Sequence, residues 1–161
     1  MRQDIMLRKD REIQSREEIL DVLKRCDTVT VSMRDGDGAY AVPVSFGISC
    51  ENGDATLWFH GAKQGRKTDA LNANPNVCVE GHIFHGVTPT QHGITTRYES
   101  VIGFGRAECV QNEEALFGLA RIVEHYGISD YPLNRCKGLP MTAVYKIRLE
   151  SLTGKRNLPE E

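Results

Sequence analysis

The sequence of 161 residues lacks any apolar run that approaches the roughly 20 residues of a membrane-spanning helix. Its N-terminus is charged throughout and has no apolar segment of the kind found in secretory signals, so we expect a cytoplasmic protein with no membrane partner. A basic excess is also missing, because the net charge is -2, and this argues against a nucleic-acid-binding module. With 40% hydrophobic and 26% charged residues, the composition predicts a single globular domain over residues 1–161.

Cysteine is present, but not in the patterns that carry disulfides or metals. The five cysteines are scattered and form no C-x-x-C pair, so we expect neither a disulfide framework nor a cysteine-rich zinc site. Most of them lie in apolar patterns and are expected in the core. Cys78, His82, His85 and His92 suggest a metal site, but their spacing matches no standard zinc pattern, and we predict none.

Along the chain, the spacing of apolar residues changes between that of a helix and the two-residue alternation of a strand. A capping box at Ser15 and Glu18 begins a helix whose apolar residues extend to Cys26. Helices are also predicted at 66–74 and 112–126, and strands at 28–33, 39–48, 55–60, 77–84, 97–110 and 141–150. Residues 85–95 are predicted to form a loop. Six strands joined mostly by hairpins, with three helices, predict a mainly β fold built as a small antiparallel barrel.

The predicted strand at 39–48 has one bulky face and one small face. The bulky side chains are Val42, Val44, Phe46 and Ile48, and the small ones are Ala41, Pro43, Ser45 and Gly47. Pro43 cannot donate to a ladder, so the strand is expected at an edge or with a bulge there. The small face leaves room for a flat ligand or a neighbouring subunit, although a plain solvent-facing side would give the same pattern.

The run LWFHGAKQGRKTDAL at 57–71 is the most informative in the sequence. An apolar strand is followed by a glycine-bounded loop that carries Lys63, and Arg66 and Lys67 follow where a helical pattern begins. Glycines allow backbone N–H groups to approach a ligand, and a helix start offers unpaired donors with the positive end of its dipole. The run therefore predicts an anion cradle, with phosphate as the favoured guest.

Two other interpretations of this run remain. Three basic residues in a surface loop can be no more than solvated charge. A nucleotide P-loop would need four residues between its glycines, whereas Gly61 and Gly65 are separated by three, and Arg66 precedes Lys67. The flanking segments also look antiparallel, so a nucleotide hydrolase is disfavoured.

Taken together, these segments resemble the FMN-binding split-barrel superfamily related to pyridoxamine 5'-phosphate oxidase, and within it the nitroimidazole-resistance (Nim-type) flavoproteins. The match follows the order of the chain over nearly its whole length. The stretches that carry it are RKDREI at 8–13, YAVPVSFG at 40–47, FHGAKQGRK at 59–67 with DAL at 69–71, RYESVIGFGRA at 97–107 and TGKR at 153–156.

The resemblance implies a six-stranded antiparallel Greek-key split barrel with about three helices, which forms a homodimer with two FMN molecules in clefts between the subunits. It implies a phosphate site at Lys63, Arg66 and Lys67. The isoalloxazine ring would lie along Val42, Pro43, Val44 and Ser45, with His60 beside it and with Tyr98, Ser100 and Val101 from the partner subunit lining the same cleft. Members often carry a cysteine and a tryptophan before the 97–107 segment, where this chain has QHGIT at 91–95. The resemblance therefore points to the cofactor more firmly than to the substrate.

Two hypotheses about function follow. The first is an FMN-dependent oxidoreductase that reduces a small flat acceptor such as a nitroaromatic, with NAD(P)H as a candidate reductant and His60 as the catalytic proton or hydrogen-bond donor. The second is a non-catalytic flavin- or haem-binding protein on the same barrel, for which His60 or a loop histidine would be an axial ligand. As a lone histidine at a strand end, His60 could also be merely hydrogen-bonded.

Overall fold

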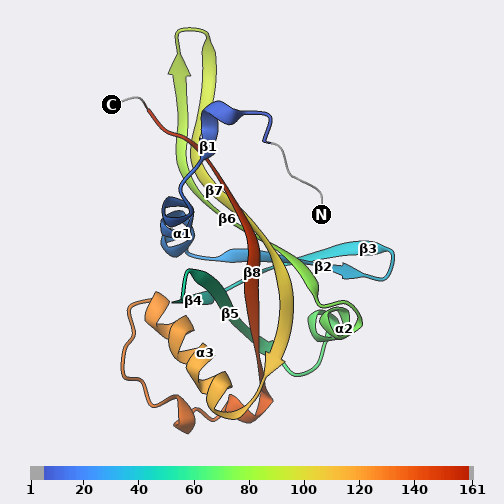
Figure 1. Cartoon of the computed structure of the whole chain (residues 1–161). Helices are drawn as coiled ribbons and strands as arrows, with labels where there is room; N and C mark the ends of the chain where they lie inside the picture. The colour runs from blue at the N-terminus through green and yellow to red at the C-terminus, as the bar shows by residue number, and fades with distance from the viewer. Residues whose placement is uncertain (1–5, 160–161) are drawn as a thin grey trace.

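The computed structural model describes residues 6–159, which form an antiparallel sheet of eight strands with three α-helices packed around it (Figure 1). The strands are β1 (Glu12–Ile13), β2 (Val29–Asp35), β3 (Gly38–Val44), β4 (Phe46–Glu51), β5 (Asp54–Ala62), β6 (Asn76–Thr90), β7 (Gly93–Val110) and β8 (Thr142–Asn157). The helices are α1 (Arg16–Arg25), α2 (Arg66–Ala73) and α3 (Asn112–His125), and single 3-10 turns are η1 (Lys9–Arg11), η2 (Leu133–Arg135) and η3 (Leu139–Met141).

The order of the strands makes the sheet a split barrel. The path is β3-β2-β6-β7-β8-β5-β4, and β1 pairs with the far end of β8. The two end strands, β3 and β4, are consecutive in sequence and are joined only by Ser45. The sheet therefore curls until its ends meet at Ser45, but within residues 6–159 those ends form no ladder with each other. The predicted mainly β split-barrel class is confirmed.

The strand count exceeds the six that were predicted, for two physical reasons. The predicted strand at 39–48 breaks at Ser45, because its first half pairs with β2 and its second half with β5. The two-residue strand β1 was not predicted, since a pairing as short as Glu12 with Lys155 leaves no periodic pattern.

The core lies inside the curled sheet, and α1 closes one side of it. Ser15 Oγ accepts the backbone N–H of Glu18, as the capping box predicted, and Ile19, Val22 and Leu23 face the sheet. Burial of each such side chain contributes about 1.5–3 kcal/mol. A Cβ at Gly154 would lie 2.7 Å from Ile19 Cγ1, so glycine in β8 allows the helix this close approach.

A second apolar cluster forms on the outside of β5 and β8, where α3 packs. It contains Trp58, Val110, Leu119, Ile122 and Val144. Gly47 lies under the helix, because a Cβ there would come within 2.3 Å of the Arg121 backbone carbon. Gly47 was expected on a ligand-facing side of its strand, and the structure assigns its small size to helix packing instead.

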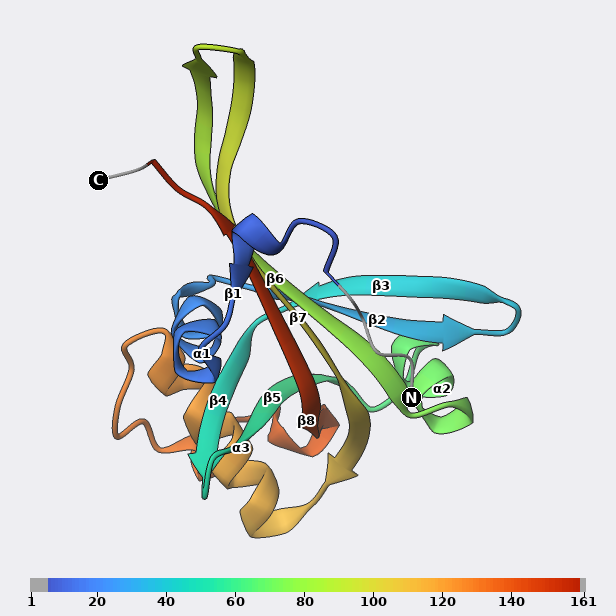
Figure 2. The same ribbon diagram turned by 45° about the horizontal axis from the view of Figure 1, so that its top comes forward.

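Beyond the body of the barrel, β6 and β7 continue as a two-stranded arm (Figures 1 and 2). The pairing extends to Thr90 and Gly93, so the predicted loop at 85–95 is wrong and the turn is confined to Gln91 and His92. A register shift between Phe84 and Gly86 leaves His85 as a bulge at the foot of the arm. The glycines and proline of this segment resemble a loop pattern, but an exposed ribbon with a bulge tolerates them.

Two further expectations can be compared with the structure. All five cysteines are free thiols, and Cys26 alone of the five is buried, so the expectation that most lie in the core is wrong. Cys50 on β4 and Cys109 on β7 are exposed. Within the described residues, no helix is long and apolar enough to cross a bilayer.

Candidate functional site

The residues of the predicted anion cradle lie around the start of α2. Gly65 is the N-cap residue with φ +124°, a conformation that favours glycine, and no side chain caps the helix. The backbone N–H groups of the first turn are therefore left without a capping acceptor and coincide with the positive end of the helix dipole. The helix begins at Arg66, as predicted, and ends before Pro75.

The cations of the cradle diverge from the helix start. Arg66 turns toward the β2–β3 hairpin, where its Nε donates to Asp35 Oδ2 at 2.6 Å and its guanidinium stacks on the Tyr40 ring at 4.3 Å. Lys67 turns the other way, over β5, and its Nζ lies 3.5 Å from the carbonyl oxygen of His60. Both side chains have replaceable partners, since an exposed ion pair such as Arg66–Asp35 contributes little stability.

Lys67 and Lys63 differ in how far their side chains are buried. Lys67 is half-buried, has no carboxylate partner among the described residues, and desolvation lowers its pKa. A nearby anion would relieve that desolvation cost, which makes the position favourable for a phosphate. Lys63 is exposed, and its side chain forms no ion pair within residues 6–159.

His60 lies where the split opens. The last β4–β5 pair is Phe46 with Phe59, so His60 and the two residues after it extend past the end of that ladder, next to Ser45. The His60 side chain is exposed and shares the Trp58 face, opposite the buried Phe59, as the alternation predicted. Neighbouring protein atoms still partly desolvate the ring, and this desolvation, followed by the charge of Lys67, lowers the pKa of His60.

The end of β3 lies beside this opening. β3 is a terminal strand of the sheet, so the edge position predicted from Pro43 is confirmed. Val44 is buried and Val42 is half-buried, whereas Pro43 and Ser45 are exposed. The fold thus brings the 42–45 segment, His60 and the start of α2 close together in space.

The other predicted site residues lie elsewhere. Tyr98 and Ser100 are half-buried on β7, three strands away from β3 in the sheet, which corresponds to roughly 14 Å at the spacing of neighbouring strands. Val101 is 1% exposed, and its side chain points into the core. Within one chain these three residues therefore do not join the 42–45 segment.

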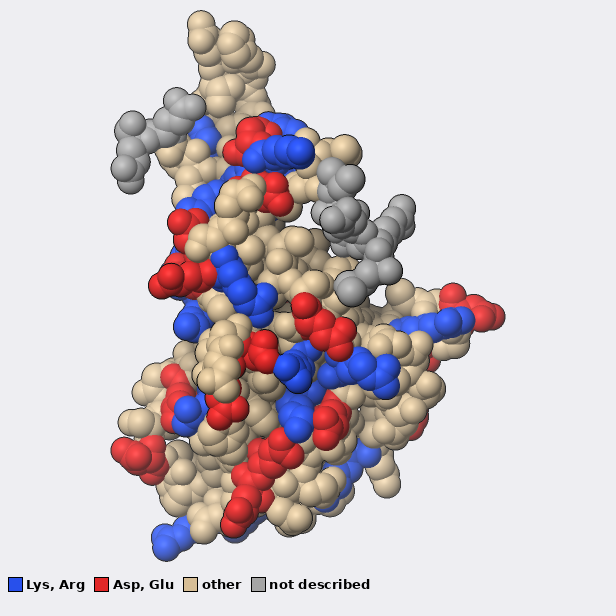
Figure 3. Space-filling model, viewed as in Figure 1, with Lys and Arg blue, Asp and Glu red and all other residues tan. Residues whose placement is uncertain are grey.

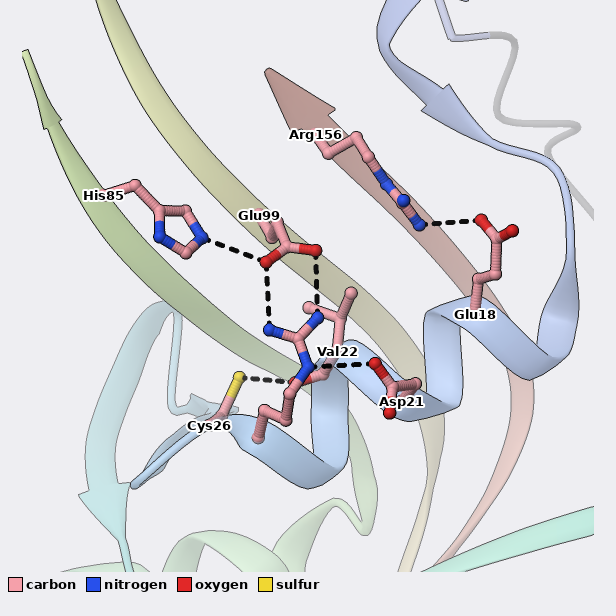
Figure 4. A network of polar contacts seen from close by, with 8 residues as sticks. Glu18, Asp21, Val22, Cys26, His85, Glu99 and Arg156 are labelled. Atoms are coloured by element: carbon pink, nitrogen blue, oxygen red, sulfur yellow. Dashed lines mark hydrogen bonds and ion pairs between the residues drawn. The ribbon is translucent and has the colours of Figure 1, made fainter. Parts of the chain in front are cut away.

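One polar cluster was missed from the sequence (Figure 4). Glu99 is 4% exposed, and its carboxylate accepts two hydrogen bonds from Arg25 at 3.0 and 2.9 Å and contacts His85 Nε2 at 3.0 Å. These contacts, led by the Arg25 hydrogen bond, lower the pKa of Glu99. The alternation of β7 places Glu99 on the same inner face as Val101 and Gly103, so a buried carboxylate could have been predicted from that period.

The histidines that suggested a metal site have other partners. His82 Nδ1 lies 2.8 Å from Glu80, and His85 contacts Glu99. Within residues 6–159 no group of three or more ligating side chains is arranged to hold a metal ion. Figure 3 shows Lys and Arg interspersed with Asp and Glu on the face viewed, and the projecting arm carries neither.

The fold and the opening beside Ser45 define a split-barrel protein, and comparisons with known proteins identify its family. A sequence profile of the family described as pyridoxamine 5'-phosphate oxidase matches residues 15–156. The chain therefore belongs to the pyridoxamine 5'-phosphate oxidase family. No curated protein matches the sequence significantly.

Among solved structures, the chain is similar to a candidate 5-nitroimidazole antibiotic resistance protein from Bacteroides thetaiotaomicron, with 25% identity, a TM-score of 0.79, and coverage of 89% of this chain and 85% of that one. It is also similar to the flavocytochrome Anf3 from Azotobacter vinelandii, with 18% identity, a TM-score of 0.75 and coverage of 96% and 73%. A third is the FAD and haem binding protein from Mycobacterium smegmatis, with 21% identity, a TM-score of 0.75 and coverage of 94% and 76%. The last two similarities show the fold alone.

Proposed function

We propose that this protein is an FMN-dependent oxidoreductase whose flavin phosphate binds at the start of α2 and whose isoalloxazine ring lies along the split at Ser45. The observation that carries the proposal is the uncapped helix start behind Gly65, which lies beside desolvated Lys67 and the open end of β5. The family membership supports it, since the family name denotes an oxidase.

Different groups at this site would bind the phosphate and the ring of the flavin. Backbone N–H groups of the first turn, with Lys63, Arg66 and Lys67, would hold the phosphate. The exposed side of Pro43 and Ser45 offers a flat surface for the ring. A bound flavin supplies the hydride and electron chemistry, and the protein orients it. His60, at the edge of the same opening, would donate a hydrogen bond or proton to the acceptor.

We further propose a homodimer that completes the cleft. On β7, Tyr98 and Ser100 share the outer face with Ile102 and Phe104, and the last two are 42% and 43% exposed. A second copy docked on this face would bring its own Tyr98 and Ser100 toward the flavin, which one chain alone does not do. Exposed apolar patches on a sheet face commonly mark such interfaces.

We also propose which acceptor and which reductant the protein uses. A small flat acceptor such as a nitroaromatic is supported by the similarity to the Bacteroides protein, and NAD(P)H is the candidate reductant. A cytoplasmic location, which stays a prediction, would give access to that reductant. The second candidate, a non-catalytic flavin- or haem-binding protein, is supported by the printed names of two similar structures and by the exposure of His60 and His92.

Absorption spectra of the purified protein distinguish these candidates. Flavin bands with release of FMN on denaturation support the oxidoreductase, and a Soret band supports haem binding. Turnover of NAD(P)H with nitroaromatic or quinone acceptors then tests catalysis. A flavin-loaded protein that transfers no electrons to any acceptor would favour the non-catalytic alternative.

Titration of FMN into the apoprotein tests the cradle itself. Arg66→Ala and Lys67→Ala are each expected to weaken binding by roughly 1–3 kcal/mol, the range of a charge-assisted hydrogen bond. Arg148→Ala is the matched control, because Arg148 is exposed and pairs with Asp54, away from α2. Unchanged FMN affinity in both cradle variants would refute the phosphate site.

A further inference from the structure

A cavity with a largely positive lining lies at the foot of the arm. It has a volume of about 520 Å³ and is lined by Asp10, Arg11, Arg97, Arg156, Asn157 and Leu158. These residues come from η1, β7 and the end of β8, three segments that are distant in sequence. Both ribbon views place this region well away from α2 (Figures 1 and 2). The cavity is therefore separate from the cradle described above.

The cavity also lies on the other face of the sheet from the proposed dimer surface. Arg97 alternates with Tyr98 along β7, and Arg156 pairs in register with the inward-facing Glu99. Figure 4 shows Arg156 on the side of β8 that α1 covers, with its guanidinium directed at Glu18. Binding of a ligand in this cavity would therefore require neither the dimer nor the flavin.

Positive charge in this cavity exceeds the negative charge that could neutralise it. Arg97 Nη1 donates to Asn157 Oδ1 at 3.2 Å and to the Leu158 carbonyl oxygen at 2.8 Å, and both acceptors are neutral. Arg11 forms no ion pair within residues 6–159. The single acidic side chain of the lining, Asp10, already accepts two hydrogen bonds from Arg8, at 2.9 and 2.6 Å.

Asp10 is bound by Arg8, an arginine that does not line the cavity. The hydrogen bonds from Arg8 lower the pKa of Asp10 to about 2, so this carboxylate is fully ionised and already paired at neutral pH. Arg156 likewise has its own partner, Glu18, at 2.7 Å. Among the described residues Arg97 therefore has no carboxylate partner, and Arg11 has only the nearby charge of Asp10, which Arg8 already binds.

The polar network around the cavity is also incomplete. The Nε atoms of Arg97 and Arg156 are buried and have no hydrogen-bond acceptor among the described residues. Buried donors in folded proteins nearly always have a partner. These two atoms are themselves enclosed by protein, so a ligand in the cavity would meet the terminal nitrogens of the guanidiniums, which the hydrogen bonds of Arg97 and Arg156 hold in place.

We infer that this cavity binds a phosphate-bearing small molecule. A guanidinium presents a planar fork of donors that matches two oxygens of a phosphate, and several such forks converge here. The volume falls within the range of about 300–1,000 Å³ that is usual for small-molecule sites. The phosphate would bridge Arg11 and Arg97, and Asn157, whose amide is bonded to Thr95, Thr96 and Arg97, would hold Arg97 in position.

Calorimetric titration of inorganic phosphate into the protein of residues 1–161 at low ionic strength tests the inference. The titration is done in a Lys63→Gln, Arg66→Gln background, which removes the exposed cations of the α2 cradle, so that failure of the flavin proposal leaves this test unaffected. Saturable binding is expected. Arg11→Gln and Arg97→Gln should each weaken it by about tenfold or more, which is the loss of one charge-assisted contact.

Matched variants make the result specific. Arg148→Gln removes an exposed arginine outside the cavity and should change the affinity by less than about twofold, since exposed charges far from the ligand are screened. The Arg11 side chain makes no hydrogen bond to residues 6–159, so its variant remains interpretable if Arg97→Gln proves unstable. Absence of saturable binding, or an equal loss in Arg148→Gln, would overturn the inference.

Further titrations identify the source of the phosphate. Tighter binding of glycerol 3-phosphate than of inorganic phosphate supports a phosphorylated metabolite, and equal binding supports free phosphate. Tighter binding of succinate than of either would overturn the phosphate assignment. Glu160 and Glu161 follow the lining in sequence and lie outside the described residues. If phosphate binds only to a chain that ends at Pro159, the cavity serves the acidic terminus and the inference is wrong.

Discussion

His60 is the residue whose replacement most directly tests the proposed chemistry. It lies at the open end of β5, its side chain is exposed, and its side chain makes no hydrogen bond to the described residues. We expect His60→Ala to retain FMN, because the phosphate contacts remain, and to slow electron transfer to a nitro or quinone acceptor by about 10–100-fold. Single-turnover reoxidation of the reduced protein measures this effect.

The pH dependence of that reaction gives a second readout. Since desolvation and Lys67 lower the pKa of His60 below its ordinary value of 6.5, the ring is mostly neutral at neutral pH. The rate advantage of the native protein over His60→Ala should therefore increase as the pH falls below 6.5, where the imidazolium becomes populated. An advantage that is the same at every pH would show that His60 does not donate a proton.

Glu99 is a structural residue, and its replacement should lower the stability of the fold. Glu99→Gln removes the charge that Arg25 pairs with, and we expect a loss of about 1–3 kcal/mol in the free energy of unfolding. The loss in unfolding free energy stays moderate because the Arg25 side chain is 44% exposed and keeps its bond to Asp21. Urea unfolding at neutral pH measures the difference.

The sign of the pH effect follows from the direction of the shift. The pKa of Glu99 in the folded chain lies below its ordinary value of 4.5, so its contribution is complete above 4.5 and is lost as the pH falls through the lower, folded value. The difference between the native protein and Glu99→Gln should therefore shrink in acid. A difference that persists at strongly acidic pH would mean that packing, not charge, is responsible.

At the scale of elements, Gly47 marks the contact between β4 and α3. Gly47→Ala would place a Cβ 2.3 Å from the Arg121 backbone, so the helix must move, and we expect a loss of about 1–3 kcal/mol in stability. Gly138→Ala is the control, because nothing lies within 4 Å of a Cβ there. Thermal unfolding compares the two. If Gly47→Ala instead leaves stability intact and impairs flavin binding, the ligand-facing interpretation of that strand was correct.

Elements whose signals are local could be predicted from the sequence. The capping box of α1 and the alternation around His60 depend on neighbours within a few residues, and both match the structure. The break at Ser45 could not be predicted, because it depends on which distant strand each half of the segment pairs with. The cluster around Glu99 joins α1, β6 and β7, so it exists only once the fold has formed.

The ladder of the arm also could not be predicted from the local sequence. Gly86, Pro89 and Gly93 resemble loop residues in the sequence, yet the segment forms a regular ladder. In cross-strand register, Val87 pairs with Thr96 and Pro89 with Ile94, so the apolar side chains share one face. Side chains on β7 alternate, and this face therefore continues into the outer face of Tyr98 and Phe104 on the barrel. An isolated two-stranded ribbon is only marginally stable in water, which suggests that the apolar face of the arm needs a partner.

For the whole molecule, this continuous outer face predicts a symmetric homodimer. Ile94 and Val87 on the arm are 77% and 58% exposed, and Phe84 at its foot is 64% exposed. The arm has no charged side chain to keep it solvated. A two-fold axis would allow each copy to cover the same patch on the other, which is the usual geometry of dimers. Light scattering of the native protein should therefore give the mass of two chains.

Charged substitutions on this face test both the dimer and its role in cofactor retention. Ile102→Glu with Phe104→Glu should weaken dimerisation by at least about 100-fold, the loss expected for two central apolar contacts, and should release flavin from the separated chains. Ile128→Glu is the control, because Ile128 is similarly exposed, at 48%, but follows α3 outside this face. Sedimentation and flavin fluorescence are measured on the same samples. A native protein that is monomeric and still binds FMN tightly would contradict the shared cleft, because all contacts of the flavin would then come from one chain.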